Sequence, residues 1–154
     1  MMKRCDKTGQ FYLLAAIVII ALVIGILSIT NYSSKKENSR VYELAEELEI
    51  ESSKILDLGA VTGNYPWDSF TRNFTNYAGK DINIIYAIGN LSDQDVFRYN
   101  EIGEKEMVLN YFQDPKVIVT LEQTNYTFTF KPGQNFYFII AQKIGGDKYV
   151  ATNE

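Results

Sequence analysis

Histidine is absent from this sequence of 154 residues, and cysteine occurs once, at Cys5. Zinc, haem and iron–sulfur centres take most of their ligands from these two residue types, so the sequence predicts no metal site and no cofactor. Ser-His-Asp and Cys-His catalysis are excluded for the same reason. A single cysteine cannot form an internal disulfide, so stability has to come from packing and hydrogen bonds.

Carboxylates and glycines offer little more chemistry. Asp93 and Asp95 are the closest pair outside the predicted helices, and they lack the dense oxygen ligands and central glycine of a calcium loop. The glycines form no phosphate-binding fingerprint. We therefore interpret the two aspartates as solvated turn residues and predict that the protein is not an enzyme and has no catalytic residue.

The charge balance also limits the partners. The net charge is −4, and three of the basic residues lie within the first nine positions, so the remainder of the chain is more acidic still. An acidic domain has no electrostatic attraction for phosphate backbones. We expect no nucleic-acid partner.

One long apolar run stands out. Residues 11–29 read FYLLAAIVIIALVIGILSI and contain no charge. As a helix they would extend about 28 Å, close to the roughly 30 Å of a hydrocarbon core. The sequence thus predicts a transmembrane helix over residues 10–30, in a single-pass protein of the cell membrane that contacts the lipid bilayer. A cleaved secretory signal is disfavoured because no small-x-small site follows the run.

Basic residues and the motif Lys7-Thr8-Gly9-Gln10-Phe11 precede the run. This segment resembles the class III signal peptide of archaeal type IV pilin-like proteins, in which a membrane peptidase cuts directly after the glycine. The resemblance implies cleavage between Gly9 and Gln10 and a place in an archaeal cell envelope. The sequence departs from the family at the fifth mature position, where Leu14 replaces the usual Glu, and at the third, where Tyr12 replaces Ser. An uncleaved anchor explains the same residues.

Four N-x-[ST] sequons follow the run, at Asn31, Asn73, Asn90 and Asn125. Such asparagines are acceptors for N-glycosylation in exported proteins. The basic residues on the two sides of the run are equal in number, so the sequons are our reason to place the N-terminus in the cytoplasm and the C-terminal domain outside the cell. A glycosylated surface protein and a chance occurrence in an asparagine-rich sequence remain alternatives.

Downstream of the run the pattern predicts an α+β fold. Apolar residues such as Val41, Leu44 and Leu48 recur at helical spacing, with glutamates on the other faces. This pattern predicts an amphipathic helix that packs on an antiparallel sheet. A second, short helix follows and ends at Gly79. Trp67, at its entrance, is either an exposed ligand-binding aromatic or a residue that fixes the loop to the core.

From Lys80 onward, alternating apolar and polar residues predict β-strands. Tyr126, Phe128 and Phe130 should share one face of a strand. Residues 136–140 are apolar throughout, as expected for a central strand covered on both faces. We expect the last fifty residues to form an antiparallel meander.

The predicted organisation has four parts. Residues 1–9 form a cytoplasmic tail or cleaved leader, residues 10–30 the transmembrane helix, residues 31–58 a linker and amphipathic helix, and residues 59–154 an extracytoplasmic β-rich domain. The expected function is that of a membrane-anchored, pilin-like surface protein with a structural or adhesive role. Its copies would associate through the membrane helix. The alternative is an extracytoplasmic accessory subunit or ligand-binding sensor that contacts another membrane protein or a sugar.

Overall fold

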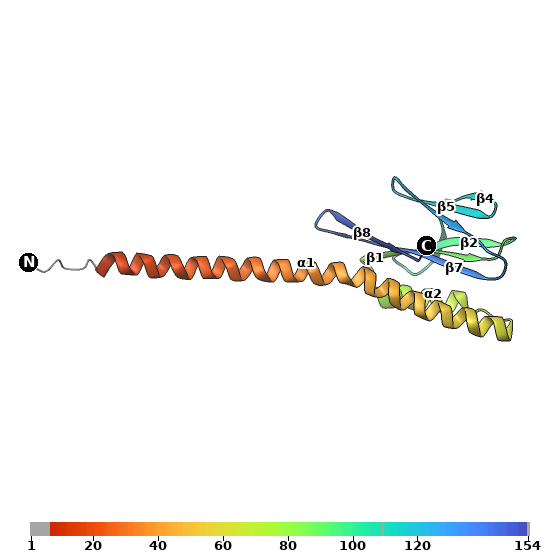
Figure 1. The fold of residues 1–154 in the computed structure, drawn as a ribbon, viewed down its shortest axis with the longest axis horizontal. Coiled ribbons are helices and arrows are strands. Elements are labelled where there is room, and N and C mark those ends of the chain that lie inside the picture. Colours follow the sequence, from red (N-terminus) through yellow and green to blue (C-terminus); the bar gives the residue numbers. More distant parts are fainter. Residues whose placement is uncertain (1–6, 109, 154) are drawn as a thin grey trace, which may run out of the picture. The chain divides into compact units, whose positions relative to one another are not determined.

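The computed structural model describes residues 7–108 and 110–153; within the first helix it describes side chains at residues 12, 15–27 and 40–62. Two helices precede the strands in this described part of the chain (Figure 1). The elements are α1 (Lys7–Thr62), α2 (Trp67–Ala78), β1 (Ile82–Gly89), β2 (Gln94–Tyr99), β3 (Lys105–Met107), β4 (Asn110–Gln113), β5 (Lys116–Leu121), β6 (Thr124–Thr129), β7 (Asn135–Ile144) and β8 (Asp147–Thr152). The chain divides into two compact units, Met1–Glu37 and Asn38–Glu154.

The second unit is built in three layers. Its middle layer is a five-stranded sheet with the order β3-β2-β1-β7-β8, and its outer layer is a three-stranded sheet with the order β4-β5-β6. All neighbouring strands are antiparallel. The C-terminal part of α1 and the whole of α2 cover the other face of the larger sheet (Figure 1).

The core between the helices and the middle sheet follows from the amphipathic pattern of α1. Val41, Leu44 and Leu48 are buried against the sheet, as their helical spacing predicts. Phe74 and Ala78 of α2 complete the helical side of this core. The predicted packing of an amphipathic helix on an antiparallel sheet is therefore confirmed.

A second core lies between the two sheets. It contains Ile85 and Ile139 of the middle sheet and Val117, Val119 and Phe128 of the small one. β7 thus faces both cores, because successive side chains along a strand point to opposite faces. This double coverage confirms that residues 136–140 belong to a strand covered on both sides.

The predicted meander over the last fifty residues is wrong at one connection. Strands β4, β5 and β6 do form a meander, but β7 leaves it and pairs with β1 along its length. A strand that is apolar on both faces needs an interior position, and the place beside β1 supplies one. The small sheet offers only one covered face.

No helix within the described residues is long and apolar enough to cross a membrane. The predictions of a transmembrane helix over residues 10–30, of a single-pass membrane protein and of location in the cell membrane are corrected by this finding.

The two helices begin and end for local reasons. α1 is helical throughout Lys7–Thr62, including residues 31–38, because the sequence has neither glycine nor proline between positions 26 and 58. α2 ends where predicted: Gly79 adopts a φ of 97° and donates its backbone N–H to the carbonyl of Thr75 at 3.2 Å. Arg40 of α1 donates to the carbonyl of Ala78 at 2.8 Å and so ties the two helices together.

Candidate functional site

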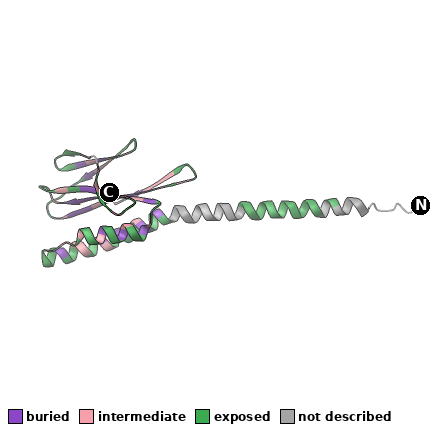
Figure 2. Ribbon diagram, turned by 180° about the vertical axis from the view of Figure 1, so that it is seen from behind, coloured by how far each residue is buried: buried purple, intermediate pink, exposed green. Residues whose placement is uncertain are grey.

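The most unusual surface belongs to α1. We call residues 15–27 the apolar segment: every one of them is apolar, and every one is exposed (Figure 2). The exposed fractions of its large side chains run from 50 % at Val23 to 62 % at Leu22 and Ile26. Contiguous apolar surface of this extent marks an interaction site in folded proteins.

Small residues interrupt the apolar segment. Ala15, Ala16, Ala21 and Gly25 lie among its larger aliphatic residues, and no heavy atom lies within 4 Å of a Cβ built at Gly25. The distance between two packed helices depends on the side chains at the contact. The segment therefore permits close approach of a second helix at Gly25.

The predicted leader-peptidase residues, Gly9 and Gln10, lie in the first turn of α1. The side chain of Gln10 is outside the described part of the chain, as is that of Asn31, the first sequon asparagine. Cleavage after Gly9 would leave the whole apolar segment on the product, because the segment begins at residue 15.

Two of the three sequon asparagines with described side chains are exposed. Asn73 lies on the outer surface of α2, and Asn125 lies in β6, where its Oδ1 accepts a hydrogen bond of 2.9 Å from Thr120 Oγ1. Asn90 is half-buried in the turn between β1 and β2. Its Oδ1 accepts hydrogen bonds from the backbone N–H groups of Ser92 and Asp93, at 2.8 and 3.0 Å. The amide of Asn90 thus also shapes its own turn.

Hydrogen bonding distinguishes the sequon of Asn73 from the other two. Its third residue, Thr75, has a half-buried hydroxyl that lies 2.8 Å from the carbonyl oxygen of Thr71 and 2.9 Å from the hydroxyl of Tyr86. Burial raises the pKa of the Tyr86 hydroxyl, and the hydrogen bond with Thr75 opposes the rise only in part. The hydroxyl of Thr75 therefore takes part in hydrogen bonds between α2 and the core of the second unit.

Trp67 takes the structural role of the two that its sequence position suggested. Its ring stacks on that of Phe136, at a centroid distance of 4.9 Å, and on that of Tyr65, at 6.0 Å. A Cβ at Gly59 would overlap the ring of Tyr65, so α1 packs against this stack. The indole is half-buried against the core and also lines a second cavity, of about 260 Å³, beside Tyr65.

Asp93 directly precedes β2, and Asp95 is the second residue of that strand. Within the described residues, no cluster of three or more acidic, histidine or cysteine side chains is suited to a metal ion. Asp95 instead forms an ion pair of 3.2 Å with Lys105, which also lies 3.5 Å from Asp68 and 4.0 Å above the ring of Phe97. Burial lowers the pKa of Lys105, but the hydrogen bond and charge of Asp95, followed by those of Asp68, outweigh it and raise the pKa.

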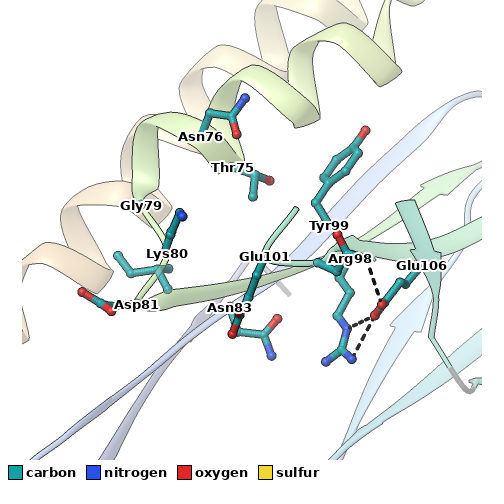
Figure 3. A pocket seen from close by; sticks show the side chains of 12 residues that line it. Thr75, Asn76, Gly79, Lys80, Asp81, Asn83, Arg98, Tyr99, Glu101 and Glu106 are labelled. Atoms are coloured by element: carbon teal, nitrogen blue, oxygen red, sulfur yellow. Dashed lines mark hydrogen bonds and ion pairs between the residues drawn. The ribbon is translucent and has the colours of Figure 1, made fainter. Parts of the chain in front are cut away.

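A polar cavity of about 380 Å³ lies where α2 ends and β1 begins (Figure 3). Figure 3 shows Asn76 and Lys80 on one side of it and Arg98 and Glu106 on the other. Its lining residues are Thr75, Asn76, Gly79, Lys80, Asp81, Ile82, Asn83, Arg98, Tyr99, Asn100, Glu101 and Glu106. No local sequence pattern points to this cavity, because its residues come from three separate stretches of the chain.

The apolar segment and the polar cavity are thus the two features that the fold itself does not require. The sequence matches no family model, no curated protein and no solved structure.

Proposed function

We propose that this chain is a non-enzymatic structural protein, pilin-like in organisation, whose copies associate through the apolar segment and display the three-layered unit. The proposal rests on one observation: every residue from 15 to 27 is apolar, and every one is exposed. Water is a poor environment for such a helix, and a helix that is apolar on every face is normally buried.

The partner that fits best is another copy of the same segment. A groove on a different protein covers one side of a helix, whereas this helix has no polar side to leave in water. Several identical helices packed together cover one another on all sides. Complete burial of a large aliphatic side chain contributes about 1.5–3 kcal/mol, so even partial burial along the segment favours assembly.

The motif before the segment supports the pilin-like part of the proposal. Cleavage after Gly9 would create a new N-terminus at Gln10, five residues before the apolar segment begins. Leu14 stands where polymerising pilins usually carry Glu, so association here would depend on apolar packing without that charged residue.

Leader processing can be tested by mass. Co-expression of the full chain with a class III leader peptidase should give a product that lacks residues 1–9 and begins at Gln10. The Gly9→Val variant should keep its full mass, because the peptidase requires the small residue at the cut. Gly25→Val, which changes a glycine in the same helix, should be processed like the unchanged chain. A full-mass product from the unchanged chain would refute the leader assignment.

Association can be tested by sedimentation velocity of the full chain and of the double variant Ile20→Lys/Ile24→Lys. The two positions lie one helical turn apart, so both lysines fall on one side of the segment. The unchanged chain should sediment as an assembly and the double variant as smaller species, because a packed interface would have to desolvate two ammonium groups.

Ile102→Lys provides the matched control, because Ile102 is 78 % exposed in the second unit and lies far along the chain from the segment. This variant should sediment like the unchanged chain. A monomeric unchanged chain, or a double variant that assembles as the unchanged chain does, would contradict the proposal. Circular dichroism establishes that all three proteins are equally folded.

A further inference from the structure

We propose that the polar cavity at the end of α2 is a binding site for a neutral saccharide. This inference does not depend on association through the apolar segment, since every lining residue belongs to the second unit. The cavity volume of about 380 Å³ falls at the lower end of the roughly 300–1,000 Å³ typical of small-ligand sites. It suits one sugar unit better than a large cofactor.

The lining matches the chemistry of a polyhydroxylated ligand. The carboxamide of Asn100 is already hydrogen-bonded to Glu106 and to its own loop. Two further carboxamides, those of Asn76 on α2 and Asn83 on β1, line the cavity. Each carboxamide offers both donors and an acceptor, and each sugar hydroxyl does the same. Neighbouring hydroxyls on a ring can therefore bond to one amide in pairs. Ile82 and Tyr99 also line the cavity and supply apolar surface for the C–H groups of a sugar ring.

One wall of the cavity is held in place before any ligand arrives. The guanidinium of Arg98 donates twice to Glu106 Oε2, at 3.1 and 3.2 Å, and Asn100 Nδ2 donates to Glu106 Oε1 at 3.3 Å. Asn100 Oδ1 in turn accepts the backbone N–H groups of Ile102 and Glu104, at 3.1 and 2.9 Å. A wall that is already ordered lowers the entropy cost of binding.

The opposite wall is fixed by the end of α2. The bond from Arg40 to the carbonyl of Ala78 holds that end, and the turn at Gly79 directs the chain into β1. Asn76 and Lys80 line the cavity on this side (Figure 3). The two walls therefore belong to a single rigid framework of helix and sheet.

Charge at the cavity disfavours an anion and a zwitterion. An anion would meet the carboxylates of Asp81, Glu101 and Glu106, while Arg98 is already paired with Glu106. A free amino acid would need strong pairing of both its charges, yet Lys80 and Asp81 are exposed, and solvent weakens such pairs. Hydroxyl groups need no charge partner and can use the amides directly.

The test is an NMR titration of the ¹⁵N-labelled full chain with glucose, galactose, mannose and N-acetylglucosamine in turn. At least one sugar should shift the amide signals of the cavity residues in a saturable way. Asn76→Leu, which removes one exposed carboxamide from the cavity, should weaken that binding by roughly tenfold or more. Asn83→Leu, which removes the carboxamide that β1 contributes to the cavity, should weaken the binding to a similar extent.

Asn73→Leu is the matched control, because it makes the same change one turn away on α2 outside the cavity lining. It should bind like the unchanged chain. The proposal is overturned by the absence of saturable shifts with all four sugars, by unchanged affinity in both cavity variants, or by saturable binding of glycine or glutamate at the same residues. The spectra themselves report whether each variant is folded.

Discussion

Replacement of Phe138 by alanine lowers the free energy of unfolding of the second unit by about 3–5 kcal/mol. Phe138 is 1 % exposed in the core between the middle sheet and the helices. It lies in β7, which is paired on both sides, with β1 and with β8. Paired strands cannot move inward to fill the space that the ring leaves, so the loss includes a cavity term as well as lost burial.

Urea unfolding monitored by tryptophan fluorescence measures this loss. Trp67 is the only tryptophan in the chain, and it stacks on Phe136 two residues from the change. Phe112→Ala is the control, because that ring is 57 % exposed on β4 and its removal should change stability by less than about 0.5 kcal/mol. Equal effects of the two substitutions would contradict the three-layered packing described above.

Gly89→Ala destabilises the same unit by about 2–6 kcal/mol, for a reason that concerns the backbone. Gly89 ends β1 with a φ of 141°, in the region that side chains rarely adopt. A Cβ there would overlap the backbone carbonyl oxygen of Asp93 and lie 2.9 Å from Cα of Gln94. The turn between β1 and β2 would have to open, and the pairing of Gly89 with Gln94 and Asn135 would be lost with it.

Gly133→Ala separates the cost of backbone strain from the cost of the close contact with Asp93. Gly133 also has a positive φ, 97°, but a Cβ there would meet nothing within 4 Å. It should therefore cost only the backbone strain, about 1–3 kcal/mol, and less than Gly89→Ala. The measurement is again urea unfolding of the two variants beside the unchanged chain. A loss at Gly133 as large as that at Gly89 would show that the close approach to Asp93 is not decisive.

Features of the fold that depend on local periodicity could be predicted from the sequence. The burial of Val41, Leu44 and Leu48 follows from a 3.6-residue repeat. The stop at Gly79 follows from a glycine placed after an amphipathic stretch. Phe128 and Phe130 are buried on one face because strand residues alternate. Each of these needs information from only a few neighbouring residues.

Features that join distant parts of the chain could not be predicted in this way. Glu122, in the turn between β5 and β6, pairs with Lys143 at 2.6 Å and with Lys148 at 3.5 Å, across to the hairpin of β7 and β8. The hydrogen bond and charge of Lys143 lower the pKa of Glu122. No spacing rule links these residues, and the same holds for Lys105 and Asp68. The pairing of β7 with β1 was missed for this reason.

The apolar run illustrates the limit of hydropathy. The sequence established that the run is apolar and that it continues without a charge, and the structure describes an exposed helix over residues 15–27. Hydropathy measures how unfavourable contact with water is for a segment, but it does not identify which surroundings the segment has instead. The polar cavity could not be predicted from local sequence either, because its lining residues come together only when α2, β1 and β2 are folded.

The helix α1 carries two constraints of different kinds. Between Val41 and Ser52 its buried positions contact fixed neighbours in a close-packed core, so exchanges there must preserve both volume and shape. Along residues 15–27 every side chain is exposed and aliphatic or small, and one aliphatic residue can replace another without disturbing any described contact of the folded unit. Relatives of this chain should therefore exchange one apolar residue for another freely over residues 15–27. They should keep individual residues at the buried positions between Val41 and Ser52.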